Sequence, residues 1–190
     1  MVRNQDWLLT KNRIIAKVYG LMGELSSRLQ EDLVAVSFEL TEIGPKISRG
    51  ENYKGLPYVM FDFPRYFKKE DTCAIRTFFW WGNYISVTLH LKGIYKDRIM
   101  ESLIDKRNIL ADNDFRLCIS GDEWEHDLNN GQYQSITSLN DLVSVDSLRG
   151  APFVKVSAAI MLEQWDQIQD KIYSRQQLLY QLVMDQFPRR

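Results

Sequence analysis

The chain has 190 residues, of which 45% are hydrophobic, and carries a formal net charge of −1. A chain of this length most simply forms one domain that buries roughly 70% of the surface its unfolded form exposes. Because it lacks an overall positive charge, dedicated binding to nucleic acid is not expected. No apolar run approaches the roughly 20 residues that span a bilayer, and the first residues lack a signal-peptide pattern, so we expect a cytoplasmic protein outside the membrane.

The N-terminal region is predicted to be helical over 6–43. Its first part has apolar residues at three- and four-residue spacing, which is typical of a core-facing stripe: Ile14, Ile15, Val18, Met22, Leu25 and Leu29. Over 31–43 the pattern fits either a strand or a helix, and we interpret it as helix. Gly44-Pro45 then ends the segment.

The polar, glycine-containing stretch 45–57 is predicted to be a structured loop. Loops of this kind often carry binding residues, and Asn52 and Tyr53 are candidates because glycines flank them. The alternative is a simple connector. Two local basic groups, one around Lys54 and one around Lys68 and Lys69, are more typical of solvated surface than of phosphate sites.

The stretch 56–93 is rich in aromatic and β-branched residues and is predicted to be the core of a sheet. A strand over 58–63 should end at Pro64, because proline cannot donate to a ladder. A hairpin should follow, with strands over 72–81 and 84–92. The connections are too short for crossover helices, so these strands should be antiparallel.

Two registers compete in this hairpin. A two-residue turn at Gly82-Asn83 would place Arg76 on the apolar face, whereas a turn one residue longer or shorter places it on the other face. We expect the second register, because an unpaired arginine in a core costs several kcal/mol and an irregular turn costs little. In either register Tyr84, Thr88 and His90 share one face, because side chains alternate along a strand.

The rest of the chain is predicted to form a helix over 94–110, a second hairpin over 115–138 that turns at Asn130-Gly131, and a last strand followed by a long helix over 153–187. Cys73 and Cys118 lie among apolar residues and are expected to be reduced and unbridged. The predicted fold class is α+β. It is a single domain with a mainly antiparallel sheet of about five to six strands and long terminal helices on one face.

The polar face of the central hairpin is the candidate site, because it combines aromatic surface with hydrogen-bonding groups, as ligand pockets do. An arginine there can bind an anion, aromatic rings can stack on a flat ligand, and a histidine can exchange a proton near neutral pH. The candidate ligand-binding residues are Arg76, Trp80, Tyr84, Thr88, His90, Asp62, Asn52 and Tyr53. The alternative is that the face is covered, or half in solvent with Arg76 paired to Asp62.

Catalytic and metal motifs are weak. A dyad of His126 and Ser135 is disfavoured, because no nucleophile elbow and no orienting acid accompany it. No phosphate-binding glycine loop or zinc-ligand spacing occurs, so we expect no cofactor and no metal.

The sequence therefore favours a non-catalytic binding or regulatory domain for a small anionic or aromatic ligand, with a small-molecule ligand or a protein as partner. A small enzyme that uses Arg76 as electrophile and His90 as acid or base is the second hypothesis. A protein-interaction module, with its partner surface on exposed aromatic residues or on the long C-terminal helix, is the third.

Overall fold

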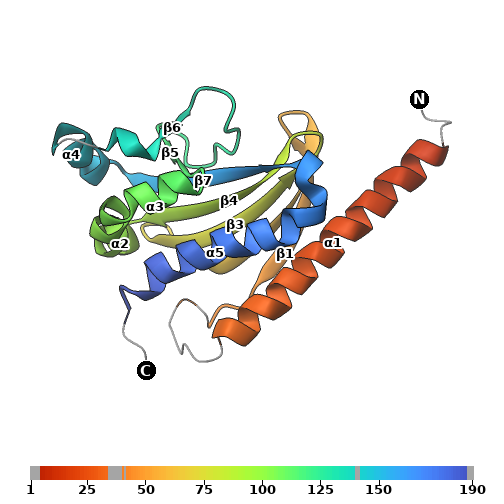
Figure 1. Ribbon diagram of the computed structural model, residues 1–190, viewed down its shortest axis with the longest axis horizontal. Helices are drawn as coiled ribbons and strands as arrows, with labels where there is room; N and C mark the ends of the chain where they lie inside the picture. The colour runs from red at the N-terminus through yellow and green to blue at the C-terminus, as the bar shows by residue number, and fades with distance from the viewer. Residues whose placement is uncertain (1–4, 34–39, 41, 140–141, 188–190) are drawn as a thin grey trace.

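The computed structural model describes residues 5–33, 40, 42–139 and 142–187 (Figure 1). Within these residues, seven strands form one antiparallel sheet in the order β1-β2-β3-β4-β7-β5-β6. The strands are β1 (Lys46–Tyr53), β2 (Leu56–Phe67), β3 (Thr72–Trp80), β4 (Tyr84–Lys92), β5 (Arg116–Cys118), β6 (Tyr133–Ser135) and β7 (Phe153–Met161). The α+β class with an antiparallel sheet is confirmed, with slightly more strands than predicted.

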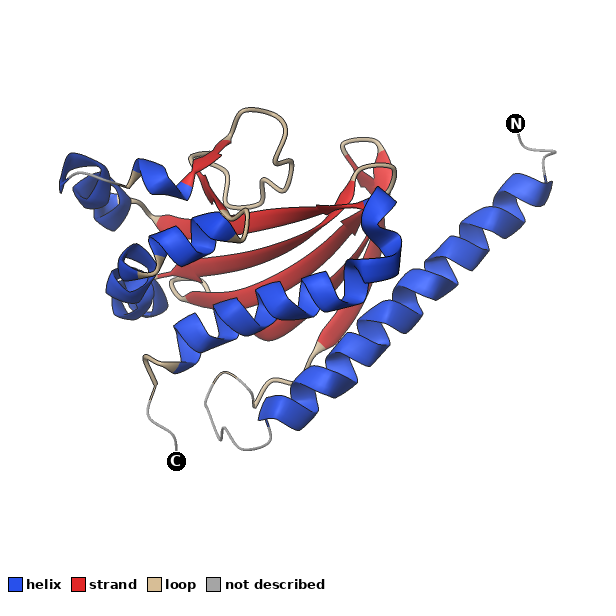
Figure 2. Cartoon of the chain, viewed as in Figure 1, coloured by secondary structure: helices blue, strands red, loops and turns tan. Residues whose placement is uncertain are grey.

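The helices are α1 (Gln5–Leu33), α2 (Ile94–Asp105), α3 (Arg107–Asp112), α4 (Leu142–Gly150) and α5 (Ile168–Met184), with short 3-10 helices η1 (Ile136–Ser138) and η2 (Leu162–Gln167). Figure 2 shows α5 and part of α1 lying across the same side of the sheet, as predicted for the terminal helices. The predicted stripe of α1 supplies this core from Val18 onward, and Met22, Leu25 and Leu29 are completely buried. None of the helices in the described part of the chain is long and apolar enough to cross a membrane.

The central hairpin has the predicted register. Trp80 pairs with Tyr84 across the turn Trp81-Gly82-Asn83, in which Gly82 has a φ of 69°. Ile75 and Val87 therefore face the helices, and Arg76 points to the other side of the sheet. The register is thus the predicted one, which keeps Arg76 out of the apolar core. Cys73 and Cys118 are both buried and unbridged.

The prediction of a loop over 45–57 is wrong, because most of this stretch is β1. Lys54 and Gly55 form a tight turn with φ of 49° and 83°, and this turn joins β1 to β2. β1 lies at the edge of the sheet, where polar residues and glycine are tolerated. The predicted end of β2 at Pro64 is also wrong. The ladder shifts register between Asp62 and Arg65, so the strand continues past the proline.

The second hairpin predicted over 115–138 forms only at its two ends, and not around the predicted turn at Asn130-Gly131. β6 pairs with β5, whereas the 119–132 segment that connects them forms no strand. The predicted helix over 94–110 is divided at Lys106 into α2 and α3. The last strand extends to Met161, so the C-terminal helix begins later than predicted. α1 ends at Leu33, and residues 34–39 and 41 of the predicted 31–43 helix lie outside the described residues.

Candidate functional site

The 119–132 segment lies over the polar face of the central hairpin, on the side of the sheet opposite α1 and α5. The Tyr84 hydroxyl donates to the carbonyl of His126 (3.0 Å) and accepts from the N–H of Leu128 (2.7 Å). The Lys155 amine donates to the carbonyls of Glu123 (3.2 Å) and Glu125. Side chains of the sheet therefore hold this segment where a β ladder is absent.

The turn between β1 and β2 holds the same segment from the side. The Tyr53 hydroxyl donates to the Glu125 carboxylate (2.7 Å) and accepts from the N–H of His126 (2.8 Å), and Lys54 Nζ lies 3.0 Å from an Asp127 carboxylate oxygen. Burial tends to raise the pKa of Glu125, but hydrogen bonds from the Asp127 N–H, Tyr53 and Lys54 outweigh it and lower that pKa overall. Through its two hydrogen bonds, Tyr53 connects the end of β1 to the 119–132 segment and has a structural role.

Two of the predicted site residues, Trp80 and Tyr84, belong to a second core beneath the 119–132 segment. Trp80 and Tyr84 pack with Phe78 and Leu128, and the Trp80 indole donates to the carbonyl of Tyr53 (3.3 Å). Thr88 is buried, and its hydroxyl lies 2.6 Å from that of Ser157. Asn52 is exposed and accepts a hydrogen bond from the Gly55 N–H (3.0 Å) inside the turn. The side chains of Trp80, Tyr84 and Thr88 are therefore in contact with other residues of the chain, at the positions where a ligand was predicted to bind.

Arg76 and Asp62 form a two-bonded ion pair between neighbouring strands. Arg76 Nε and Nη2 lie 2.7 and 3.0 Å from the two carboxylate oxygens of Asp62, and Nη1 lies 3.2 Å from His126 Nε2. The two side chains of the pair are only 11% and 9% exposed. The structure thus shows the Arg76–Asp62 pairing that the sequence left as the alternative, and the guanidinium is already occupied.

His126 is held between an aromatic ring and two cationic groups. Its ring stacks on Phe78 with centroids 4.8 Å apart, and Nδ1 lies 3.4 Å from Lys155 Nζ. Burial lowers the pKa of His126 well below its usual value of 6.5, and the charges of Lys155 and Arg76 lower it further. The pKa of Lys155 is lowered to about 8, chiefly because its ammonium is buried.

His90 lies farther along the same face and is also held neutral. Burial lowers its pKa to about 3, together with the nearby charges of Lys155, Arg76 and Lys92. Its Nε2 makes no hydrogen bond within the described residues, although a Glu123 carboxylate oxygen lies 3.4 Å away. A neutral histidine with an unsatisfied ring nitrogen therefore lies on the covered face at this end of the sheet.

A hollow of about 450 Å³ opens at the His90 end of the hairpin. It is lined by Phe67, Lys68, Lys69, Thr72, Lys92, Glu123 and Trp124. Strand pairing explains part of this arrangement, because Phe67, Thr72 and Lys92 lie directly opposite one another on β2, β3 and β4. Glu123 and Trp124 come from the 119–132 segment and line the side of the hollow that faces away from the sheet.

The aromatic walls of this hollow rest on the predicted site residues. The Phe67 and Trp124 rings lie 6.1 Å apart, and the Arg76 guanidinium lies 5.6 Å and 5.9 Å from their respective centres. The His90 ring lies 5.8 Å from that of Trp124. On the rim, the Glu123 carboxylate lies 3.8 Å from the Lys92 amine. Arg76 and His90 therefore support the hollow from behind.

Sequence reasoning missed Phe67, Lys92 and Trp124. The available signals were the lysines that follow Phe67, which were interpreted as solvated surface, and a tryptophan inside an acidic stretch. Neither signal connects two segments more than fifty residues apart in the chain.

A larger hollow of about 720 Å³ lies beside α4, between Leu117, Ser147 and Phe153. Its described lining contains no charged side chain, so it offers no cation to an anionic ligand, unlike the hollow beside Lys92. The disfavoured dyad of His126 and Ser135 is not formed within the described residues: the Ser135 hydroxyl lies 2.7 Å from that of Thr137, and the His126 ring contacts Arg76 and Lys155.

Within residues 5–33, 40, 42–139 and 142–187, no three His, Cys, Asp or Glu side chains are grouped so that they could hold a metal ion. No protein-family model and no curated protein sequence matches this chain.

Proposed function

We propose that this protein is a non-catalytic binding domain that takes a small anionic ligand with an aromatic ring in the hollow beside Lys92 and Trp124. The observation that carries the proposal is the lining of that hollow, in which two aromatic rings and three lysines surround about 450 Å³. Ligand pockets have roughly this volume, about 300–1,000 Å³, and combine apolar walls with a few polar groups.

The aromatic rings would hold the flat part of the ligand. Trp124 and Phe67 are 49% and 36% exposed, so part of each side chain is accessible although both lie against Arg76 and His90. A ring stacked on such a pair gains about 0.5–1.5 kcal/mol beyond the burial of its area. The guanidinium and the imidazole behind the rings limit their movement, which reduces the entropy lost on binding.

The lysines would hold the anionic group. Lys68, Lys69 and Lys92 contribute three positive charges to the lining and Glu123 a single negative one, in a chain whose net charge is −1. In the structure the Glu123 carboxylate lies 3.8 Å from Lys92, where a ligand anion would bind. On binding, the anionic group of the ligand would replace the Glu123 carboxylate beside Lys92. Release of Glu123 would in turn loosen the part of the 119–132 segment around it.

A binding role also fits the histidine better than acid–base chemistry does. A general acid or base works best when its pKa is near the working pH, and burial lowers the pKa of His90 to about 3. Arg76, the other predicted catalytic group, already binds Asp62 through two hydrogen bonds. Both groups are thus better suited to support the walls of a pocket than to react.

The test is a thermal-shift measurement with three aromatic anions, phenyl phosphate, indole-3-acetate and adenosine monophosphate, each beside its uncharged analogue. A ligand at 100 times its dissociation constant stabilises the folded state by about 2.7 kcal/mol. We expect at least one anion to raise the melting temperature while its uncharged analogue does not. Trp124→Ala and Lys92→Gln should abolish the shift, because they remove the ring and the anion contact.

Lys171→Gln is the matched control, because this lysine lies on α5 and hydrogen-bonds to Gln164 (3.0 Å), away from the hollow. It should leave the shift unchanged. The proposal fails if none of the three anions stabilises the wild type, or if Trp124→Ala and Lys171→Gln respond alike.

A further inference from the structure

The Glu123 carboxylate lies between the amine of Lys92 and the imidazole of His90. Its Oε1 lies 3.8 Å from the Lys92 amine, and its Oε2 lies 3.4 Å from Nε2 of His90. The first distance is too long for a hydrogen bond, and His90 Nε2 is buried and makes none within the described residues. An amine and a buried ring nitrogen thus converge on one carboxylate that binds neither of them closely.

The fold brings these three groups together from two segments. His90 and Lys92 are two residues apart on β4, so both side chains point to the face that the 119–132 segment covers. Lys155 lies opposite His90 on β7 and donates to the carbonyl of Glu123 (3.2 Å), which fixes the backbone there. The Glu123 side chain is 26% exposed, so it can turn into solvent without displacing a strand.

We infer that this position binds the phosphate group of a small aryl phosphate monoester, which takes the place of the Glu123 carboxylate between Lys92 and His90. The inference rests on the proposed function, since it names the anionic group that the same hollow takes. Glu123 is then the chain's own substitute for the ligand. His90, whose side chain is only 6% exposed, becomes an accessible hydrogen-bond donor when Glu123 turns away.

The charge of the hollow favours a phosphate over a carboxylate. The three lysines and one glutamate of its described lining leave an excess of two positive charges. A phosphate monoester carries a charge of about −1.5 to −2 at neutral pH and has three terminal oxygens. A ligand carboxylate brings only the charge and the two oxygens that Glu123 already supplies, so its exchange adds little attraction to offset the cost of association.

His90 can supply a hydrogen bond although it is uncharged. A neutral imidazole has one N–H group. The carboxylate 3.4 Å from Nε2 favours the tautomer with its proton on that nitrogen, because the other tautomer turns a lone pair towards the negative charge. Hydrogen bonds to an ionised partner are stronger than those between neutral groups. His90 would therefore donate to a phosphate oxygen from the covered side, while the lysines bind it from the rim.

Calorimetric titration of the full chain with phenyl phosphate and with phenylacetate tests the choice of anion. The two ligands share the ring and one linking atom, and they differ in the anionic group. We expect the wild type to bind phenyl phosphate roughly tenfold more tightly or better, because the phosphate adds charge and a third oxygen. Equal affinities for the two ligands overturn the inference.

Two substitutions test the position of the phosphate. Glu123→Gln removes the competing charge and should tighten the binding of phenyl phosphate several-fold. His90→Leu removes the donor and should weaken binding roughly tenfold, whereas His90→Gln keeps an N–H group and should weaken it less. Far-ultraviolet circular dichroism of each variant should match the wild type.

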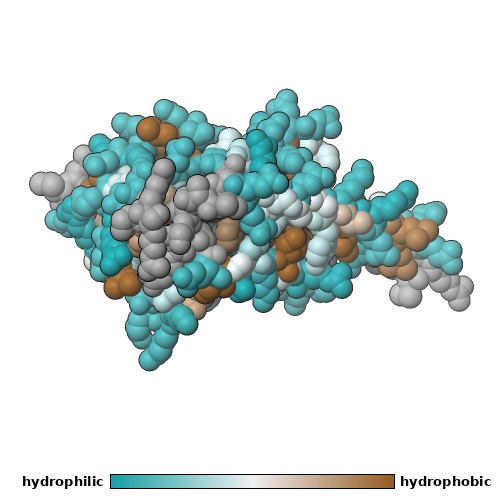
Figure 3. Space-filling view, turned by 90° about the horizontal axis from the view of Figure 1, so that it is seen from below, coloured by the Kyte–Doolittle hydropathy of each residue, from teal (hydrophilic) through white to brown (hydrophobic). Residues whose placement is uncertain are grey.

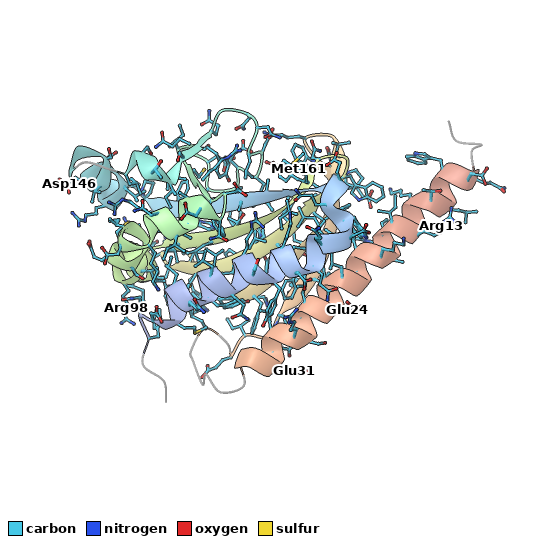
Figure 4. The ribbon with its side chains drawn as sticks, in the orientation of Figure 1. Arg13, Glu24, Glu31, Arg98, Asp146 and Met161 are labelled. Carbon is cyan, nitrogen blue, oxygen red and sulfur yellow. The ribbon has the colours of Figure 1, made fainter. Side chains whose placement is uncertain are left out.

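Glu163→Gln is the matched control, because it removes the same charge elsewhere. Glu163 is exposed and follows Met161 at the end of β7, whereas Lys92 lies at the other end of the sheet, two residues before α2 begins. Figure 4 shows these two ends through the labelled side chains of Met161 and, on α2, Arg98. Glu163→Gln should leave the affinity for phenyl phosphate unchanged.

Heteronuclear NMR of the imidazole nitrogens shows whether the phosphate reaches His90, and it uses the wild type. The chain has 2 histidines, and the other one, His126, stacks on Phe78 beneath the 119–132 segment. Phenyl phosphate should shift the Nε2 resonance of His90 more than that of His126. The spectrum of His90→Gln, which lacks one ring, assigns the signals.

The outcomes separate this inference from the proposed function. Hydrophobic side chains are also exposed on the projecting end of α1, where Figure 3 shows them and Leu8 is 46% exposed. A ring bound there would respond neither to Glu123→Gln nor to His90→Leu. Phenyl phosphate binding that neither variant changes, or an unmoved His90 resonance, overturns the inference alone. If no aromatic anion binds the wild type or Glu123→Gln, the proposed function and this inference both fail.

Discussion

Replacing Arg76 with alanine should strongly destabilise the fold, because it leaves a buried carboxylate without its partner. Arg76 makes two hydrogen bonds to Asp62, at 2.7 and 3.0 Å, and a third contact to His126 at 3.2 Å. The side chains of the pair are 11% and 9% exposed, so water screens the charge of the abandoned carboxylate poorly. Removing one partner of a buried pair typically costs about 3–5 kcal/mol.

Urea unfolding followed by circular dichroism measures this cost. The loss for Arg76→Ala should be about 3–5 kcal/mol, a large share of the roughly 5–15 kcal/mol that stabilises an ordinary domain. Asp62→Ala should cost a similar amount, since it leaves the guanidinium unpaired. The double variant should lose clearly less than the sum of the two, because no buried charge of the pair then remains.

Arg149→Ala provides the matched control. Arg149 also binds carboxylates, those of Glu101 (2.8 Å) and Asp146 (3.1 Å), but on the surface of α4. Its removal should leave the free energy of unfolding unchanged within error. A loss of less than about 1 kcal/mol for Arg76→Ala, similar to the Arg149 control, would refute the structural role of the Arg76–Asp62 pair.

Three further outcomes follow from the same buried face. His90 is protonated below about pH 6.5 in the unfolded chain but only below about pH 3 in the folded chain. The free energy of unfolding of the wild type, measured by urea titration, should therefore decrease as the pH is lowered from 6.5 to 3, and it should decrease less steeply in His90→Gln. The pKa of Lys155 is about 8 in the folded chain and 10.5 for an ordinary lysine. As the pH rises from 8 to 10.5, the free energy of unfolding of the wild type minus that of Lys155→Met should therefore increase, by at most about 1.4 kcal/mol per pH unit. A flat difference would contradict the buried ammonium. Tyr84→Phe removes hydrogen bonds to His126 and Leu128, so it should cost about 1–3 kcal/mol and speed amide exchange in the 119–132 segment.

The register of the central hairpin could be predicted because a single residue decides it. One choice placed Arg76 in the apolar core, which is costly, and the other placed it beside Asp62. The helical stripe of α1 was equally clear, since Val18, Met22 and Leu25 recur at helical spacing and all are buried. Where the local pattern of apolar residues matches the final burial, the sequence is sufficient to predict the register of a strand or the buried face of a helix.

The 119–132 segment could not be predicted in the same way. Asn130-Gly131 is a typical hairpin turn, but the hydrogen bonds that hold the segment come from Tyr84, Tyr53 and Lys155, all distant in the chain. The edge strand β1 was missed because it pairs on one side only, so glycine and polar residues are acceptable there. Tertiary contacts override local pattern at both places.

The hollow that we propose as the site lies at the His90 end of the hairpin face that the sequence indicated, but neither Arg76 nor His90 lines it. Arg76 and His90 were predicted to touch the ligand, whereas the structure places them behind the rings of Phe67 and Trp124. Alternation along a strand shows which residues share a face. It does not show which distant segment covers that face, and here that segment supplies Trp124, a ring of the proposed site.

Amide NMR spectra recorded during titration with phenyl phosphate test the proposed site most directly. If the ligand binds as proposed, the amides that shift should belong to Phe67, Lys68 and Lys92 and to Glu123 and Trp124 in the covering segment. Trp124→Ala should abolish these shifts. Shifts gathered instead around Leu117–Gly121 and Ser144–Phe153, which border the uncharged hollow beside α4, or no saturable shifts at all, would contradict the account.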